Sequence, residues 1–565
     1  DRGPALGSPR AEAVLETVAT LSLCIVLAFS PGIFAMCVLA LLWQGSLNLM
    51  VHTLVMLLLL FVMCCPCCTI CCSRKREATS VALRWLRRRK YVIAASLLLG
   101  SLAFVVSFYF VVLSTDFVTP TPDLNTDYDA SLPVAVVGSG PSGLSAAWML
   151  AKGGRRVTIF ESLGEIGGHS KSWVETSNGQ NLTIDLGFIF SNAAADAYVS
   201  YKHFAGHFNR SLISTALNTS GYFGGEYWDN TGDPERFDAP LKEEIAHFME
   251  LANGETSTFS YFAPLAMWLW YHGFSERFYK LCIRSTMSVL FVTKMGLPKQ
   301  AAWAVLSFFR SDGGYTHLRY DLPKVQFSPG GSQFMWKDVA ADMLSTGRAR
   351  VRLNSLVTLV QKERGRWTLT LADGSSHGGF GDVVLACPAD VSAKIVAGQF
   401  LQRYIVSQIS YIDAAVTLHT DAQATVGAGF QQASEEVLYF VSHGHMTGKI
   451  GKIFGDPSSD LLLTVHGQEH ERLNIDPAKV RWTTTWSHHS FSIFELGMAR
   501  KFVPLFNHGG GLHFSGDWLY GIGHNDAIKS GIHAACVVGV TRRPQDSASD
   551  PLYTHLLERT CRLSG

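Results

Sequence analysis

The sequence lacks a strong charge imbalance, a dense set of cysteines outside its N-terminal part, internal repeats and low-complexity tracts. A formal net charge of +1 over 565 residues argues against a nucleic acid as the partner, because nucleic-acid-binding surfaces are strongly basic. Only four cysteines follow residue 114, which is too few for a fold held together by disulfides; they are Cys282, Cys387, Cys536 and Cys561. The length, with 47% hydrophobic residues, allows two or three domains.

Hydrophobic residues are concentrated before residue 114, in three runs without aspartate, glutamate, lysine or arginine. The runs are 21–43, 47–63 (extendable through cysteines to Ile70) and 91–113. Runs of this length predict transmembrane helices, so we expect a membrane anchor over 21–113 that follows an N-terminal tail, 1–20. Two alternatives stay open: the runs are buried helices of a soluble core, or the first run is a secretory signal peptide.

The loop between the second and third runs is strongly basic. Residues 73–90 contain eight lysines and arginines and a single acid, Glu77. The positive-inside rule places this loop on the cytosolic, matrix or stromal side, so with three spans everything after residue 114 lies on the opposite side. Three N-x-S/T sequons, at Asn181, Asn209 and Asn218, suit a lumenal domain, although such triplets also arise by chance. The expected partner is the lipid bilayer, and the organelle is left open.

Six cysteines cluster within Cys64–Cys72, between the second run and the basic loop. Cysteines in this position are typical of S-acylation. Two other interpretations remain: small apolar filling of the segment, and metal binding by overlapping C-x-x-C pairs. No histidine or second spaced pair accompanies the cluster, so no metal site is predicted.

After a Pro/Thr/Asp-rich linker, 114–130, a short apolar run ends in glycines. Val134–Val137 is typical of a buried parallel strand, and "GSGPSG" at 138–143 has the G-x-G-x-x-G spacing before a helix-forming stretch. The glycines permit a tight turn, the approach of a pyrophosphate and close packing of helix on strand, while the first N–H groups of the helix face the phosphates. A second strand ends at Glu161, placed to accept hydrogen bonds from a ribose. This unit predicts an adenine dinucleotide, without separating FAD from NAD.

No second unit of this kind is present. "NHGGGLHF", at 507–514, precedes a strand instead of following one, so it has the wrong order for a second dinucleotide site. We therefore expect no resident NAD(P)H. Electrons would come from an organic substrate and leave to oxygen, a quinone or a partner protein.

The residues after Glu161 make a family resemblance specific. "IGGHS" ends at Ser170, and "IDLGFIFSN" carries Asp185 and Gly187 in a strand-like run. With the glycine turn, these segments resemble the flavin-containing amine oxidase superfamily. They are similar in particular to FAD-dependent amine-oxidase-like proteins associated with cyclopropane-fatty-acid-synthase-type lipid enzymes, in which "GGH" replaces the "GGR" of other amine oxidases. The resemblance implies FAD as the cofactor and a fold of two domains.

Later segments extend the resemblance over most of 131–545. "FSPGGSQFMW" resembles the family's "GGS" element, 349–387 reads as a β-meander that brings a backbone contact to adenine in the family, and "LHFSGDWLYGIGHNDAIKSG" resembles its FAD-closing motif. The motif and the resemblance together imply these cofactor-binding residues: Gly138, Ser139, Gly140, Pro141, Ser142, Gly143, Glu161, Ser162, Gly167, Gly168, His169, Ser170, Gly187, Val357, Gly516, Asp517, Asn525, Asp526 and Ser530.

The predicted fold class is α/β. A Rossmann-like FAD-binding domain is interleaved with an α+β substrate domain and preceded by about three transmembrane helices. The FAD-binding domain would comprise 131–195, 322–400 and 500–545, the substrate or cap domain 196–321 and 401–499, and a C-terminal tail 546–565.

Two functions are compatible with these features. The first is a membrane-anchored FAD-dependent oxidoreductase that oxidises a hydrophobic (lipid or isoprenoid) or amine substrate. The aromatic-rich stretch 255–320 would then be an apolar tunnel or lid, although ordinary core packing also explains it. The alternative is a flavin-binding or degenerate accessory subunit of a larger membrane complex, without its own turnover.

The candidate catalytic residue is His524, which matches a family position near the flavin. It could act as acid, base or orienter, and a turn-capping role is equally compatible with its position. No lysine matches the flavin-facing lysine of other amine oxidases, which leaves amine oxidation itself in doubt. Cys387 follows a buried strand and is interpreted as structural.

Overall fold

The computed structural model divides into two compact units, Asp1–Asp116 and Phe117–Gly565. The structure describes residues 122–177, 180–194, 197–216, 218–231, 237–254, 260, 263–291, 297–310, 324–426, 437–442, 445–467, 474–490, 503, 510–521, 523–541 and 550–562. The predicted tail, the three predicted spans, the basic loop and the cysteine cluster lie outside these residues and stay predictions. Within the described part of the chain, no helix has both the length and the apolar character needed to cross a bilayer.

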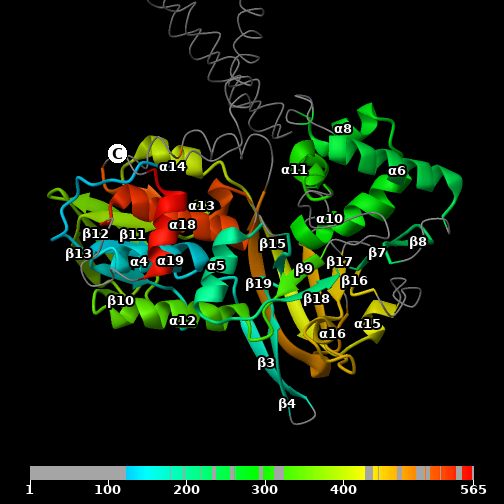
Figure 1. The fold of residues 1–565 in the computed structure, drawn as a ribbon, viewed down its shortest axis with the longest axis horizontal. Helices are drawn as coiled ribbons and strands as arrows, with labels where there is room; N and C mark the ends of the chain where they lie inside the picture. Colours follow the sequence, from blue (N-terminus) through cyan, green and yellow to red (C-terminus); the bar gives the residue numbers. More distant parts are fainter. Residues whose placement is uncertain are drawn as a thin grey trace, which may run out of the picture. The chain divides into compact units, whose positions relative to one another are not determined.

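A five-stranded parallel sheet forms the centre of one half of the second unit (Figure 1). Its order is β10 (Ala349–Arg352), β2 (Val157–Phe160), β1 (Val134–Val137), β14 (Asp382–Leu385) and β20 (Leu512–Phe514). All four neighbouring pairs are parallel. The carboxyl ends of β1 and β2 therefore meet at the same edge, and the glycine turn and Glu161 follow them there.

Both faces of this sheet are covered, which explains why its strands are almost wholly apolar. Val134 and Val136 face a core shared with helices α4 (Pro141–Lys152), α12 (Ser332–Ser345) and α18 (His524–Val538). Ala135 and Val137 face a second core beneath a meander and helix α13. The elements of this second layer are β11 (Val357–Glu363), β12 (Arg366–Leu371), β13 (Ser376–Phe380) and α13 (Ala389–Ile395).

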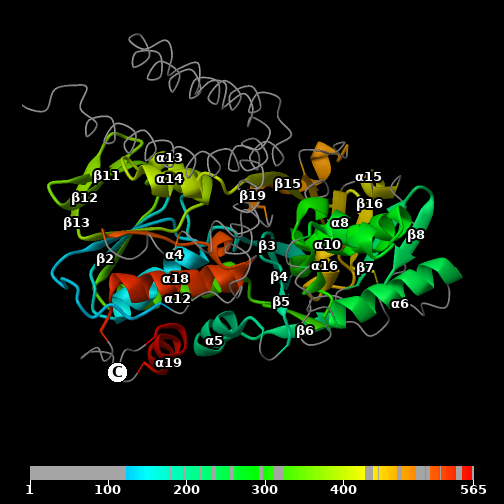
Figure 2. The same cartoon turned by 90° about the horizontal axis from the view of Figure 1, so that it is seen from above.

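A seven-stranded, mainly antiparallel sheet forms the other half of the unit. Its order is β19 (Val480–His489), β15 (Tyr411–His419), β18 (Leu462–Gly467), β17 (His445–Gly448), β16 (Tyr439–Ser442), β7 (Thr219–Phe223) and β8 (Glu226–Asp229). Its helical neighbours include α6 (Ala239–Gly254), α8 (Leu265–Tyr271) and α10 (Arg284–Phe291), which Figures 1 and 2 both label. Helix α11 (Ala302–Leu306) lies beside them in Figure 1. Several aromatic residues of the predicted tunnel, such as Trp268 and Phe278, pack in this helical core.

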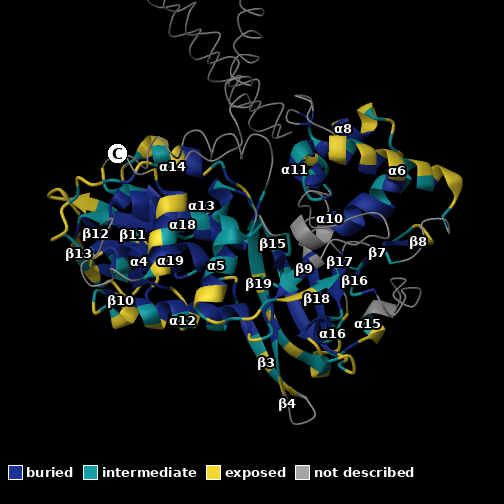
Figure 3. Cartoon of the chain, in the orientation of Figure 1, coloured by how far each residue is buried: buried dark blue, intermediate teal, exposed yellow. Residues whose placement is uncertain are grey.

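Smaller elements complete the unit. They are hairpin β3 (Ser172–Ser177) and β4 (Gln180–Asp185), strands β5 (Ser191–Asn192), β6 (Ile213–Ala216) and β9 (Lys324–Phe327), and helices α5 (Val199–His207), α9 (Glu276–Phe278), α14 (Phe400–Val406), α15 (Gln423–Val426), α16 (Ile450–Ile453) and α19 (Pro551–Thr560). Figure 3 shows that the buried residues lie mainly on the two sheets and on the helix faces that cover them.

The segment predicted as a C-terminal tail contains helix α19, which packs into the core. Its Tyr553 and Leu556 are buried with α4 and α18, and Asp550 caps the helix by accepting the N–H groups of Leu552 and Tyr553. A disulfide joins Cys536 of α18 to Cys561 just after α19. The small number of cysteines led us to expect a fold that disulfides do not hold together, and this pairing was not predicted.

Candidate active site

The glycine turn has the geometry that its spacing predicts. Gly138 has φ of 101°, and a Cβ there would lie 2.7 Å from the carbonyl oxygen of Ala386. A Cβ at Gly143 would lie 2.0 Å from the carbonyl oxygen of Gly138, so helix α4 can pack on β1 only without a side chain there. At Gly140, by contrast, a Cβ would meet no atom within 4 Å. Gly138 and Gly143 are therefore required by the packing of the protein backbone. Gly140 instead leaves an open space beside the turn.

Glu161 closes the same end of the sheet. Its Oε2 atom accepts the N–H of Ser139 at 2.8 Å and the hydroxyl of Ser139 at 2.6 Å, while Oε1 accepts the N–H of Leu163 at 2.8 Å. These bonds fix the carboxylate against the first turn after β1. The hydroxyl of Ser162 also donates to Oε1, at 3.1 Å, so all four lone-pair sites of the carboxylate are in use. A ribose hydroxyl would bind here by replacing one of the two serine hydroxyls as donor.

A cavity of about 450 Å³ extends from this turn into the second half of the unit. Thirteen residues predicted from the sequence line it: Gly138, Ser139, Gly140, Pro141, Ser142, Glu161, Ser162, Gly168, His169, Gly187, Gly516, Asp517 and His524. Seven predicted cofactor residues are not among its lining: Gly143, Gly167, Ser170, Val357, Asn525, Asp526 and Ser530. The structure thus gathers most of the predicted set around one space.

The residues outside the lining mainly hold the site together. The N–H of Gly167 donates to the carbonyl of Ser139 at 3.0 Å, which joins the "GGH" loop to the glycine turn. Ser530 accepts the N–H of Gly516 at 2.9 Å, and thereby fixes the loop that carries Asp517. Asn525 accepts the N–H groups of Ser200 and Tyr201, at the start of α5.

Val357 begins β11 and is buried in the core beneath the meander, away from the cavity lining. Residues 354 and 355, just before Val357, are hydrogen-bonded to the segment that carries Glu161. The N–H of Ser355 donates to the carbonyl of Glu161 at 2.7 Å, and the N–H of Asn354 donates to the carbonyl of Leu163 at 2.9 Å. The backbone contact to adenine near Val357 stays a prediction.

His524 lies at the first turn of α18, and its nitrogens are already in contact with protein groups. Its Nε2 atom accepts the indole N–H of Trp336 at 2.7 Å, and Ser170 Oγ lies 3.3 Å from Nε2 and 3.5 Å from Nδ1. Its ring stacks on Phe188 at a centroid distance of 4.0 Å. Burial lowers the pKa of His524 to about 3, so the ring is neutral. This geometry favours an orienting role over proton transfer, and the catalytic assignment stays a prediction.

The remaining wall of the cavity was not predicted residue by residue. It is mainly apolar and aromatic: Phe188, Ile189, Phe190, Tyr198, Phe308, Tyr411, Val416, Tyr439, Met446, Leu463, Val465 and Trp486. Val416, Val465 and Met446 are paired side by side across β15, β18 and β17. The period-two pattern of such strands indicates one buried face, but the sequence does not indicate which strands become neighbours.

Two histidines supply polarity to this apolar wall. The ring of His169, from the "GGH" loop, lies 4.6 Å from that of Trp486 and 5.7 Å from that of His488. His169 is exposed only toward the cavity that it lines. Protein atoms around the cavity keep water away from the ring, and this desolvation lowers the pKa of His169. Burial, and then the nearby His169, lower the pKa of His488 to about 3. Both rings are therefore neutral near pH 7 and offer one N–H donor and one acceptor each.

The thiol of Cys387 also borders the cavity. Burial raises its pKa to about 11, and its sulfur lies 3.2 Å from Ser392 Oγ. A protonated thiol is a poor nucleophile, which supports the structural interpretation.

The cofactor end of the cavity fits the ADP part of a dinucleotide. The open space at Gly140 admits a pyrophosphate, and α4 begins at this point without a side-chain cap, so its first N–H groups can bind phosphate. Glu161 borders the same space. Among the described residues, a parallel sheet with this turn and a cavity that extends from it to a second sheet define the class of dinucleotide-binding α/β proteins.

A comparison of the sequence with known protein families identifies the family within this class. Residues 141–422 match the family described as flavin containing amine oxidoreductase. The chain belongs to the flavin-containing amine oxidase superfamily, and its cofactor is FAD.

Individual proteins resemble the chain either in fold or over short stretches. Wild-type putrescine oxidase bound to putrescine has a TM-score of 0.51 at 15% identity, covering 72% of this chain and 98% of that one, so the likeness concerns the fold alone. The carotenoid phi-ring synthase of Streptomyces griseus is 38% identical over 73 residues, or 13% of this chain and 14% of that protein. The thiamine thiazole synthase of Desulfosudis oleivorans is 66% identical over 35 residues, 6% of this chain and 14% of its own length. The chain thus spans only a small part of either curated relative.

Proposed function

We propose that the protein is a membrane-anchored FAD-dependent oxidoreductase whose substrate is hydrophobic, of the lipid or isoprenoid type. The observation that supports this most directly is the wall of the cavity beyond the cofactor end. Aliphatic, thioether and aromatic side chains from four neighbouring strands form it, including Val416, Tyr439, Met446 and Val465. Burial of a long apolar substrate against this wall would supply the binding free energy, at about 25 cal/mol per Å² of apolar surface removed from water.

The charges around the cavity favour this substrate over an amine. Among the described residues that line it, the carboxylates are Glu161 and Asp517, and there is no lysine. Glu161 is hydrogen-bonded to the glycine turn, and the Asp517 carboxylate lies 3.7 Å from His489 Nδ1. An ammonium group at the apolar wall would therefore lose its hydration without gaining a carboxylate partner there, which is costly.

The chain's own residues can position such a substrate. When bound, FAD supplies the chemistry of hydride acceptance from a substrate C–H bond. Gly140 and the start of α4 would hold the pyrophosphate, and Glu161 would hold a ribose. The neutral imidazoles of His169 and His488 would hydrogen-bond a hydroxyl or carbonyl group on an otherwise apolar molecule, while Trp486 and the aliphatic wall exclude water.

Exposed aromatic residues support the bilayer as a partner. Trp270 and Tyr271 of α8 are 78% and 66% exposed, and Phe400 of α14 is 82% exposed. Figure 1 shows α8 and α14 along the same upper margin of the second unit. Aromatic side chains of this kind favour the membrane–water interface. The last predicted span ends at residue 113, a short linker before the described chain, so this unit would stay close to the bilayer.

Flavin reduction tests the proposed substrate class. The full-length protein in lipid nanodiscs would be mixed under anaerobic conditions with long-chain isoprenoid or lipid alcohols, and separately with aliphatic mono- and diamines. We expect the flavin absorbance to bleach with members of the first group only. Bleaching by amines alone would refute the hydrophobic substrate. A stable flavin spectrum that no lipid extract of the native membrane bleaches would favour the accessory-subunit alternative.

A matched pair of variants links the result to the apolar wall. Met446→Gln adds a buried amide at nearly constant volume, whereas Met446→Leu keeps the wall apolar. We expect Met446→Gln to raise KM for the apolar substrate about tenfold, which corresponds to a loss of roughly 1.4 kcal/mol of binding free energy. Met446→Leu should change KM little. Flavin content should be the same in both.

A further inference from the structure

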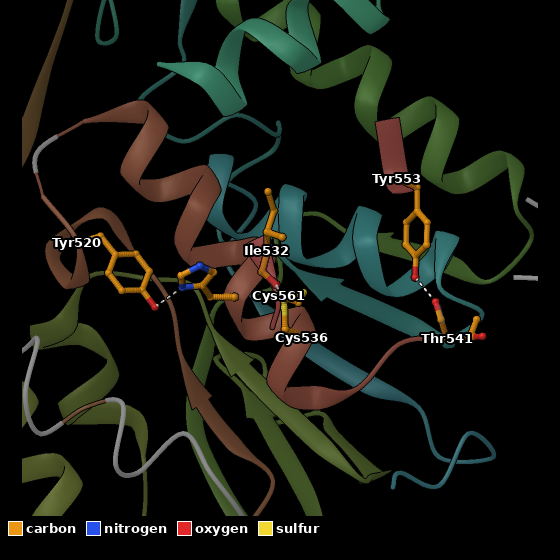
Figure 4. The surroundings of a disulfide bond; sticks show 7 residues. Tyr520, Ile532, Cys536, Thr541, Tyr553 and Cys561 are labelled. Atoms are coloured by element: carbon orange, nitrogen blue, oxygen red, sulfur yellow. Dashed lines mark hydrogen bonds between the residues drawn. A yellow bond between two sulfur atoms is a disulfide. The ribbon is translucent and has the colours of Figure 1, made fainter. Parts of the chain in front are cut away.

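The disulfide between Cys536 and Cys561 lies inside the fold, and it is distinct from the active site. Figure 4 shows the bond between Cys536 of α18 and Cys561, which follows α19. Tyr553 of α19 lies apart from it, and its hydroxyl donates to the carbonyl of Thr541 at 2.6 Å. The two Cα atoms are 5.9 Å apart, a normal separation for a disulfide, and both residues are buried. Such structural disulfides persist in oxidising compartments and are rare in the cytosol.

The disulfide also fastens the segment through which the chain enters this unit. Pro122 accepts the N–H of Arg562 at 2.7 Å, the residue next to Cys561. The N–H of Leu124 donates to Arg562 at 3.0 Å, and that of Asn125 donates to the carbonyl of Cys536 at 2.9 Å. The segment that leads from the predicted anchor is therefore hydrogen-bonded to both sides of the disulfide, at Cys536 and at the residue next to Cys561.

Two of the three sequons present their asparagine at the surface. Asn181 is exposed on β4, and Figure 1 shows the β3–β4 hairpin extending beyond the rest of the unit. Thr176 Oγ1 donates to its amide oxygen at 3.0 Å, so this contact does not use the amide nitrogen to which a glycan is attached. Asn209 is exposed after α5 with φ of 53°, and Ser211 of the same sequon is also exposed.

The third sequon is built into the seven-stranded sheet. Asn218 is half-buried, and the next two residues, Thr219 and Ser220, are completely buried in β7. The carbonyl of Asn218 accepts the N–H groups of Leu438 and Tyr439, at 3.1 and 2.9 Å. A branched sugar attached here would have to displace this packing.

We infer that the unit from residue 117 onward works in the lumen of the secretory pathway or outside the cell, with N-linked glycans on Asn181 and Asn209 but not on Asn218. Three separate features agree on this side of the membrane: the disulfide, the exposure of two sequons and the basic loop at 73–90. The inference does not depend on the substrate proposed above, and it excludes the matrix and the stroma.

Both modifications use reactants that such a compartment supplies. The thiols of Cys536 and Cys561 lose two protons and two electrons, and a protein disulfide that accepts them is reduced to two thiols. At each asparagine, the amide nitrogen forms a bond to the anomeric carbon of a polyprenyl-diphosphate-linked oligosaccharide. The carbon–oxygen bond to the diphosphate breaks, and the nitrogen gives up one proton.

Electrophoretic mobility tests the glycans on the full-length chain expressed in cultured animal cells. Treatment with peptide N-glycosidase should remove two glycans from the wild type, one from N181Q or N209Q, and none from the double variant. N218Q, the matched control, should behave as the wild type. No shift in the wild type, or a lost step in N218Q, would overturn the inference. Mass spectrometry of the released peptides reports each site directly, even where a variant folds poorly.

The disulfide has an independent test in the wild-type protein. Cells would be treated with an alkylating reagent before lysis, and the unreduced protein digested for mass spectrometry. We expect the peptide that contains Cys536 to be linked to the one that contains Cys561, and the link to disappear after reduction. Recovery of both cysteines as alkylated thiols would refute an oxidising environment for this unit, whatever substrate the flavin site accepts.

Discussion

The two ends of the cavity differ in what holds their residues in place. At the cofactor end, backbone atoms set the geometry: the carbonyl oxygens of Gly138 and Ala386 leave no room for side chains at Gly143 and Gly138. At the other end, side chains from separate strands set it, as with Val416, Met446 and Val465. The comparison teaches that the cofactor can be inferred from a short stretch of sequence, whereas the substrate wall exists only after the strands have assembled.

The largest expected effect separates two glycines of the same turn. Gly143→Ala places a Cβ 2.0 Å from the Gly138 carbonyl oxygen, so we expect little folded protein. Gly140→Val directs its side chain into open space, so we expect folded protein with almost no bound FAD. Circular dichroism and the ratio of flavin to protein absorbance measure the two outcomes.

Gly206→Val is the matched control for this comparison. A Cβ at Gly206 in α5 also meets no atom within 4 Å, but Gly206 does not line the cavity. This variant should keep its flavin. Full flavin content in Gly140→Val would show that the open space beside α4 is not the pyrophosphate site.

A smaller loss is expected at the ribose contact. Glu161→Gln replaces one acceptor of the carboxylate by an N–H₂ group that faces the N–H donors of Ser139 and Leu163. We expect it to lower the free energy of unfolding by about 1–3 kcal/mol and to weaken FAD binding about tenfold or more. Urea unfolding and flavin titration of the apoprotein measure the two effects. Equal FAD affinity in Glu161→Gln and in the exposed control Glu558→Gln would count against the assignment.

Acid should affect the unit through its buried neutral histidines. Burial lowers the pKa of both His524 and His533 to about 3, below the unfolded value near 6.5. The stability that depends on these neutral rings is fully present above about pH 6.5, the pKa of histidine in the unfolded chain. It is lost as the pH falls toward about 3, the pKa of the two histidines in the folded protein. Between pH 7 and 5 each should cost roughly 2 kcal/mol of unfolding free energy. Urea midpoints at the two pH values measure the loss, and His533→Phe should lose less than the wild type. An unchanged pH dependence in that variant would contradict this account.

The smallest effect on stability is expected at the exposed aromatic residues. Trp270→Gln and Phe400→Ser remove apolar surface from the exterior, so the free energy of unfolding should change by no more than about 0.5 kcal/mol. Their effect should instead appear in contact with lipid. Photo-crosslinking by diazirine lipids in nanodiscs should label peptides from α8 and α14 in the wild type and less in the variants. Labelling elsewhere in the unit, with none on these helices, would show that another face meets the bilayer.

Much of the cofactor site was predictable because its determinants are local. The order of β1, turn, α4, β2 and Glu161 lies within one continuous stretch, and the family resemblance added the "GGH" loop and the loop at Gly516. Of the predicted residues, those that do not line the cavity mostly support others that do, as Ser530 supports Gly516. Residue type and spacing do not show whether a residue lines the cavity or supports one that does, because both kinds of residue occur within the same short motifs.

The sequence by itself determined the dinucleotide turn, since only glycine fits where backbone atoms meet at 2.0–2.7 Å from a would-be Cβ. It also determined that β1 is buried on both faces of the parallel sheet, because the strand is apolar at every position. Only the tertiary structure decided that His169 and His488 lie together, that the strands bearing Val416, Val465 and Met446 are neighbours, and that Cys536 pairs with Cys561. These contacts join residues far apart in the chain, and their closeness depends on how complete elements pack.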